Sequence, residues 1–204
     1  MIRAWGPVGD LSPTGPQGFP DPFSAEHQNR SDVEAAGHEE GFTAWLRGLA
    51  EELDAELDAE PHSADVHEFL WTEFTRNGAM PAPYFAPLLV ERRRALAQRA
   101  VEALLENVRR DTGRALTVEV TSEAPSLLEP AGHVSVGGET IQGIDPSDVF
   151  VETAEGLQCL LADRDRLIWP MCPEHRVGAH AMRTEAGAVW MCSVTSHEVA
   201  PIML

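Results

Sequence analysis

The 204-residue sequence contains no lysine, only three cysteines, one tyrosine and no long apolar run. A membrane-spanning helix needs about eighteen or more consecutive apolar residues, so we expect no membrane span. The first seven residues lack the apolar centre of a secretory signal, which makes a cytoplasmic location the expectation. Three cysteines disfavour a disulfide framework, and because two of them lie in a Cys/His cluster, metal binding is the better interpretation in a reducing compartment.

Basic residues are scarce and unevenly placed. The net charge is −18, and all 15 basic residues are arginines. Residues 86–114 hold seven arginines and four acidic residues. Acidic residues outnumber arginines 16 to 4 before this segment and 13 to 4 after it. This charge repels nucleic acid and anionic membranes and would attract a basic protein partner. Most acidic proteins, however, use such charge only for solubility.

Signatures of common enzyme classes are also missing. The sequence has no phosphate-binding loop, no dinucleotide-binding glycine pattern and no G-x-S-x-G motif. His62, His67 and nearby carboxylates could in principle form a metal-hydrolase site, but no spacing such as H-E-x-x-H requires one. We therefore assign no catalytic residue and expect a protein that is not an enzyme.

The N-terminal half predicts helices after a loose arm. Residues 1–30 hold five prolines and four glycines, which favours a flexible arm. Ser31 and Glu34 form a capping box for a helix whose apolar stripe runs to Pro61. A second helix is expected from Ser63 to Asn77. The longest helix is expected at about 86–111, after an extended segment that contains Pro81, Pro83 and Pro87.

The centre of the chain predicts about three antiparallel strands and one helix. Residues 115–121 alternate between apolar and polar, and Gly137-Gly138 is typical of a hairpin turn. Asp145-Pro146 then starts a helix, with aspartate as the cap and proline at the first position. Cys159 in this helix has no metal-spaced neighbour and is expected to be a buried free thiol.

The basic segment of the longest helix has two interpretations. Its arginines could pair with the acidic first helix, or they could contact nucleic acid. No interleaved aromatic residues support the second interpretation. The residues concerned are Arg92, Arg93, Arg94, Arg99, Arg109 and Arg110.

The strongest chemical signal lies near the end of the chain. Cys172 and His175 form one close pair, and Cys192 and His197 form another. The segment between them predicts a β-hairpin with its tip at residues 184–187, which would bring the pairs together. Two thiolates and two imidazoles make a tetrahedral zinc site with no open position, so we expect structural rather than catalytic Zn²⁺. His180 is a fifth candidate, either as a ligand or as a hydrogen-bond partner of one.

This segment resembles the C-terminal module of small uncharacterised proteins from actinobacteria such as Streptomyces. The resemblance rests on W-P-x-C-P-x-H at residues 169–175, then a further histidine, W-x-C at 190–192 and the closing His197-Glu-Val-Ala. It covers residues 146–204 at most. It implies a recurrent zinc-ribbon-like module and brings no activity with it. Ser193–Ser196 departs from the glycine-rich residues that often precede the final histidine.

Together these features predict an α+β protein in three parts. They are a flexible arm (1–30), an α+β core (31–168) and a zinc-ribbon-like hairpin (169–204). We expect a non-catalytic, cytoplasmic interaction protein with a structural zinc site and a protein partner. The alternatives are a zinc-dependent hydrolase and a nucleic-acid-associated protein that uses the arginine-rich helix.

Overall fold

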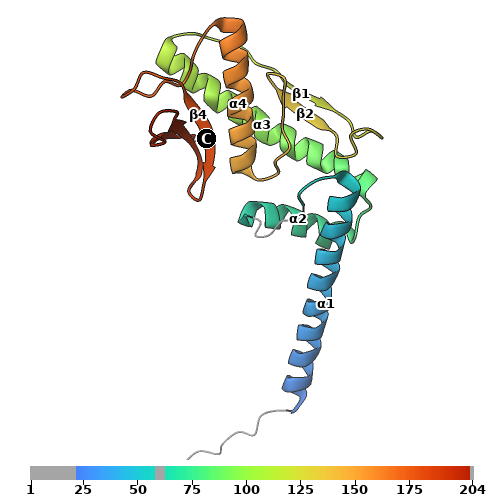
Figure 1. Cartoon of the computed structure of the whole chain (residues 1–204). Coiled ribbons are helices and arrows are strands. Elements are labelled where there is room, and N and C mark those ends of the chain that lie inside the picture. The colour runs from blue at the N-terminus through green and yellow to red at the C-terminus, as the bar shows by residue number, and fades with distance from the viewer. Residues whose placement is uncertain (1–21, 58–62, 203–204) are drawn as a thin grey trace, which may run out of the picture. The chain divides into compact units, whose positions relative to one another are not determined.

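The structure is a computed structural model that describes residues 22–57 and 63–202, with side chains from residue 37 onward. These residues form an α+β protein with four helices and two three-stranded antiparallel sheets (Figure 1). None of these helices combines the length and hydrophobicity that crossing a bilayer requires. The elements are α1 (Pro22–Leu53), α2 (Ala64–Asn77), α3 (Ala82–Thr112), β1 (Val120–Glu123), β2 (His133–Val136), β3 (Glu139–Thr140), α4 (Pro146–Asp165), β4 (Ala179–Thr184), β5 (Gly187–Cys192) and β6 (Glu198–Pro201).

The first helix differs from its predicted bounds at both ends. It begins at Pro22 and passes through Ser31, so the capping box predicted there is wrong. Serine is tolerated inside a helix at a cost of only about half a kcal/mol, and an N-cap motif alone therefore does not force a start. The helix ends at Leu53, where Asp54 takes a left-handed conformation (φ 49°). Pro61, the predicted stop, lies outside the described residues, as do residues 1–21 of the predicted arm.

Contact density divides the chain into two compact units, Met1–Glu39 and Glu40–Leu204. The core lies in the second unit, where the described side chains of α1 from Phe42 onward pack with α2 and the start of α3. The predicted hairpin belongs to the same unit as the predicted core. A separately folding module at 169–204 stays a prediction.

The second and third helices show one prediction confirmed and one corrected. Ser63 caps α2 by accepting a hydrogen bond from the Val66 amide, as expected. The third helix starts at Ala82 rather than near 86 and includes both Pro83 and Pro87. A proline inside a helix removes one hydrogen bond, but the neighbouring Phe85 is completely buried. Burial of this turn outweighs the local preference of proline.

The first sheet has the order β1-β2-β3, and Gly137-Gly138 makes the predicted turn between β2 and β3. The predicted strand at 115–121 pairs only from Val120 onward, although its apolar residues are more buried than its polar ones. The turn lies so close to α4 that a Cβ on Gly156 would come within 2.2 Å of the Val136 carbonyl oxygen. Close packing therefore explains a glycine inside α4.

The fourth helix lies between the two sheets (Figure 1) and begins as predicted, with Asp145 as its cap and Pro146 first. Cys159 on this helix is exposed, so the predicted buried thiol is wrong. Its neighbours Leu157 and Leu161 face the core instead. Leu157 and Leu161 belong to a hydrophobic cluster that α4 and α3 share with Trp169 and the second sheet. That sheet has the order β4-β5-β6 and carries the Cys/His pairs.

Candidate metal centre

Two short loops with the same backbone hydrogen bonds hold the Cys/His pairs. Residues Cys172–Val177 form the first loop, and residues Cys192–His197 form the second loop. In the first loop, the Cys172 amide donates to the Val177 carbonyl at 2.8 Å, and the Arg176 amide donates to the Cys172 carbonyl at 2.8 Å. In the second loop, the Cys192 amide donates to the His197 carbonyl at 2.9 Å, and the Ser196 amide donates to the Cys192 carbonyl at 2.9 Å. Each loop therefore curls its backbone around its own cysteine.

The fifth position of each loop has a left-handed backbone. Arg176 and Ser196 both have φ 53°, a conformation that non-glycine residues seldom adopt. The chain turns sharply there and returns beside its own start.

The sheet register places the two loops side by side. Ala179 pairs with Cys192 across the β4–β5 hairpin, and Met171 bridges to Gly178 just before β4. The first loop therefore precedes the hairpin and the second follows it, both at the same end. The predicted arms and tip of this hairpin are confirmed, whereas β6, which closes the second loop, was not predicted.

Four side chains converge between the loops. The ligand atoms of Cys172, His175, Cys192 and His197 all lie within 4.8 Å of one another. Cys172 Sγ is 3.5 Å from both His175 Nδ1 and His197 Nε2, and Cys192 Sγ is 3.4 Å from His175 Nδ1. A tetrahedron with Zn–S of about 2.3 Å and Zn–N of about 2.0–2.1 Å has S···N edges of about 3.5–3.6 Å. The group has the size of a tetrahedral metal site and is compatible with zinc.

The two histidines present different nitrogens to this centre. His175 turns Nδ1 inward, whereas His197 turns Nε2 inward. The outer nitrogen of His197, Nδ1, lies 2.7 Å from Thr195 Oγ1. A metal bound at Nε2 would leave the proton on Nδ1, which would then donate to this hydroxyl and hold the ring orientation.

His180 is not a member of the four-residue group. It lies on β4 opposite Met191, and its Nδ1 is 3.5 Å from Ser193 Oγ. That hydroxyl itself donates to the Gly178 carbonyl at 2.8 Å. His180 therefore contacts the second loop without reaching the centre.

Burial and backbone amides shape the electrostatics of the centre. Both thiols are completely buried, while the two histidines are partly exposed. Burial alone would raise the pKa of Cys192, but hydrogen bonds from the Val194 and Thr195 amides and from Cys172 lower it to about 6. The Val194 amide lies 3.5 Å from Cys192 Sγ. The second loop thus favours a thiolate, the form that binds metal.

The centre is fixed to the core through polar contacts beneath it. Gln158 on α4 donates from Nε2 to the carbonyls of Trp169 and Ala179, at 3.1 and 2.7 Å. Trp169 donates from Nε1 to Asp111 Oδ2 at 2.9 Å and packs edge-on against Trp190. Sequence analysis missed Gln158, Thr195 and Asp111. Only the closeness of Thr195 to His197 in sequence offered a signal.

Among the described side chains, which for α1 begin at residue 37, no arginine of the arginine-rich segment of α3 pairs with the first helix. Arg92 pairs with Asp65 on α2, which corrects the expectation of pairing with α1. Arg94 and Arg109 pair with glutamates of α3 itself. Arg110 donates to Asn107 at 2.5 Å. These contacts within the protein occupy much of the charge that a nucleic-acid contact would need.

Comparisons with known proteins leave this centre as the main guide to function. No protein-family model matches the chain, and no curated protein and no solved structure is significantly similar to it.

Proposed function

We propose that this is a non-catalytic protein in which a structural zinc ion holds the C-terminal hairpin as a zinc-ribbon-like module. The observation that carries the proposal is the convergence of four metal-binding atoms from two equivalent loops, at the spacing of a tetrahedral site. Two thiolates and two imidazoles complete the coordination of Zn²⁺, which leaves no position for a water or a substrate.

The hairpin benefits from such an ion. A two-stranded hairpin such as β4–β5 is only marginally stable by itself in water. Structural zinc contributes on the order of 10–16 kcal/mol of apparent binding free energy in small domains. An ion between the two loops would fix the end of the sheet that carries both cysteines.

The same centre supports a reducing, cytoplasmic location, because its buried thiols serve as ligands only when they are not oxidised. Kinship with the similar actinobacterial proteins is part of this proposal. It rests on the W-P-x-C-P-x-H string, whose cysteine and histidine both enter the centre.

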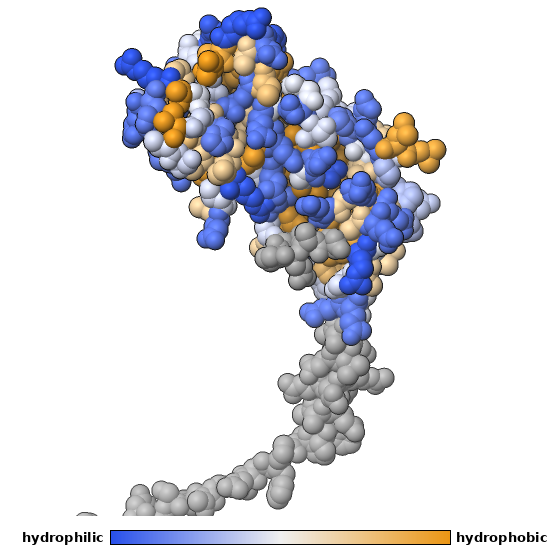
Figure 2. Space-filling view, in the orientation of Figure 1, coloured by the Kyte–Doolittle hydropathy of each residue, from blue (hydrophilic) through white to orange (hydrophobic). Residues whose placement is uncertain are grey.

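Exposed apolar side chains around the loops support a protein partner. Met171 and Val194, each next to or near a cysteine ligand, are 50% and 59% exposed, and Ile168 is 66% exposed. Figure 2 shows such apolar side chains as isolated groups on a mainly hydrophilic face. With a net charge of −18, the partner surface that best fits would combine small apolar pockets with basic residues.

Metal content tests the proposal. Purified full-length protein is expected to contain one equivalent of zinc by elemental analysis. Cys172→Ser should lose most of it, whereas Cys159→Ser, which changes an exposed cysteine outside the centre, should retain it. Wild-type protein with far less than one equivalent, after purification without chelators and with zinc supplied, would overturn the proposal.

A further inference from the structure

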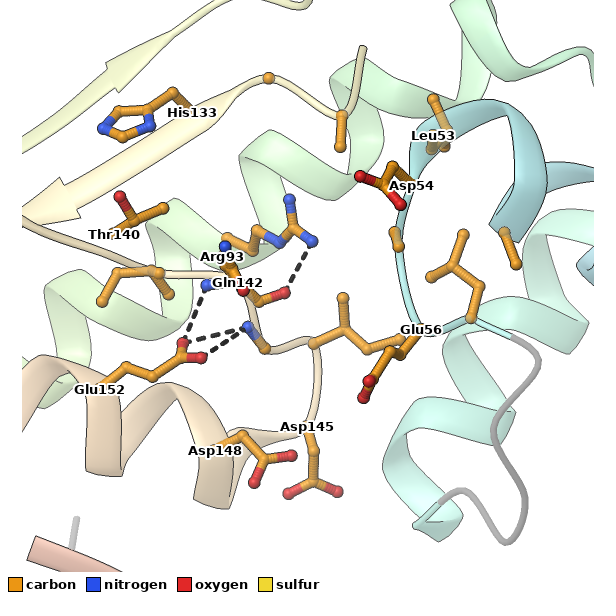
Figure 3. A pocket seen from close by; sticks show the side chains of 18 of the residues that line it. Leu53, Asp54, Glu56, Arg93, His133, Thr140, Gln142, Asp145, Asp148 and Glu152 are labelled. Atoms are coloured by element: carbon orange, nitrogen blue, oxygen red, sulfur yellow. Dashed lines mark hydrogen bonds between the residues drawn. The ribbon is translucent and has the colours of Figure 1, made fainter. Parts of the chain in front are cut away.

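A large cavity lies far from the metal centre in the fold, among the end of α1, the β2–β3 region and the start of α4. Its volume is about 1200 Å³. Small-molecule sites usually have volumes of about 300–1,000 Å³, so this cavity can hold a small ligand with water around it. Figure 3 shows its polar side chains, which come from the segment after α1, from α3, β2, β3 and α4, and from the loop between β3 and α4.

Most charged groups at the α4 side of the cavity are already occupied. Glu152 accepts hydrogen bonds from the amides of Gln142 and Gly143. Asp145 caps α4, and Arg183 pairs with both Asp145 and Asp148. These groups shape the wall of the cavity and hold the loop that precedes α4.

Arg93 is the exception in this wall. Its side chain extends from α3 toward the cavity (Figure 3), and the residue is only 5% exposed. One guanidinium nitrogen, Nη2, donates to the Gln142 carbonyl at 2.6 Å. Its Nε is buried with no hydrogen-bond partner, and Arg93 forms no ion pair with any residue that the structure describes.

A buried arginine without an ion pair is costly. Burial lowers the pKa of Arg93, and the nearby Glu152 offsets this only in part. The cost of a buried charge is offset when an anion supplies the missing partner. Arg93 therefore provides the cavity with a carboxylate-binding group that the protein itself leaves incompletely paired.

Acidic side chains line the cavity on the side of α1. Asp54 and Glu56 lie in the segment that follows this helix, and Figure 3 shows both on the opposite side of the cavity from Glu152. Neither forms an ion pair among the described side chains. The cavity thus offers Arg93 from α3, Arg47 from α1, and the anionic Asp54 and Glu56 from the segment after α1.

We propose that this cavity binds a small zwitterion, with its carboxylate on Arg93 and its ammonium group near Asp54 and Glu56. A simple anion would be repelled by the acidic side, and a simple cation would leave Arg93 without a partner. A ligand with both charges satisfies both sides. Amino acids and amino-terminated carboxylic acids are the chemical class that fits.

Titration of the full-length protein with defined probes tests this site. The probes are glycine, 4-aminobutyrate and 6-aminohexanoate, which separate the two charges by increasing lengths. Each is compared with the carboxylic acid and the amine of the same carbon number. Binding is followed by chemical-shift changes in ¹H–¹⁵N spectra, which also report whether each variant is folded.

At least one zwitterion is expected to bind at least tenfold more tightly than both of its single-charge analogues. The double variant Asp54→Asn, Glu56→Gln should weaken this binding at least tenfold. Asparagine tolerates the left-handed backbone of residue 54, so the fold should persist. Glu102→Gln, an exposed position on α3 outside the cavity, is the matched control and should bind like the wild type.

Two results would overturn the proposal. One is that no zwitterion binds more tightly than its single-charge analogues. The other is that the folded Asp54→Asn, Glu56→Gln variant binds as tightly as the Glu102→Gln control. Because the probes act far from the cysteines, neither result bears on the metal centre.

Discussion

The first and second loops have the same backbone but supply their histidines differently. In the first loop the histidine ligand is three residues after the cysteine, whereas in the second it is five residues after. Thr195 takes the place that His175 holds in the first loop. Its hydroxyl contacts the His197 ring and hydrogen-bonds Cys192, and Thr195 is not one of the four grouped residues. The backbone thus fixes the cysteines alike, and the histidines reach the same point through different nitrogens.

The largest expected effect comes from removing the cysteine of each loop. Cys172→Ser with Cys192→Ser should abolish zinc binding and lose the hairpin structure, because two ligands of four disappear. Amide hydrogen exchange should show loss of protection in β4, β5 and β6, while α2 and α3 keep theirs. Cys159→Ser is the control. Full protection of the hairpin in the double variant would show that the two loops fold without metal.

Lowering the pH should weaken metal binding through protonation of Cys192 in the second loop. The pKa of Cys192 is lowered to about 6, so this thiol is already ionised at neutral pH. Protonation of Cys192 competes with metal as the pH falls through about 6, so occupancy against a competing chelator should fall most steeply below this pH. In metal-free protein the same lowered pKa stabilises the fold fully above about pH 9, and this contribution is lost as the pH falls to 6. A release midpoint above pH 7 would contradict this reading.

A smaller effect should follow from removing the Thr195 hydroxyl, which contacts His197 and also lowers the pKa of Cys192. Thr195→Val keeps the shape of the side chain but removes the hydroxyl next to His197 Nδ1. Loss of such a partner typically lowers metal affinity about 10–100-fold. Competition with a chromophoric chelator measures this change. Ser193→Ala, which removes a hydroxyl of the same loop that does not contact His197, should have a smaller effect, and equal losses would show that Thr195 has no specific role.

The smallest effect should come from the left-handed fifth positions. Glycine adopts φ 53° without strain but costs more entropy on folding, so Ser196→Gly should change the free energy of unfolding by no more than about 1 kcal/mol. Arg176→Gly should behave alike if the loops are equivalent. Chemical denaturation of zinc-loaded protein measures both. Destabilisation of one variant by several kcal/mol, but not of the other, would break the equivalence of the loops.

The sequence predicts the centre better than it predicts the helices. Cys172, His175, Cys192 and His197 were identified because metal geometry imposes close spacing, and the hairpin tip between them has a strong turn signal. The predicted start of α3 near residue 86 is wrong because burial of residues such as Phe85 outweighs the preference of proline for positions outside a helix. The predicted start of α1 at Ser31 is wrong because a capping motif can lie inside a longer helix.

Features that depend on distant contacts could not be predicted. Gln158 supports the centre through carbonyls 11 and 21 residues away in sequence. Arg93 faces a cavity whose other walls come from several elements far apart in the sequence, so its incomplete pairing is invisible in the sequence. Glycine is unfavourable inside a helix, and only the close packing against Val136 explains why Gly156 lies in α4.

X-ray absorption at the zinc K-edge tests the central claim most directly. The account predicts two sulfur ligands at about 2.3 Å and two nitrogen ligands at about 2.0–2.1 Å, with no oxygen ligand. The spectrum should be unchanged in Cys159→Ser. A zinc ion with a water or carboxylate oxygen in place of either histidine, or with only one sulfur, would contradict a closed structural site built by two equivalent loops.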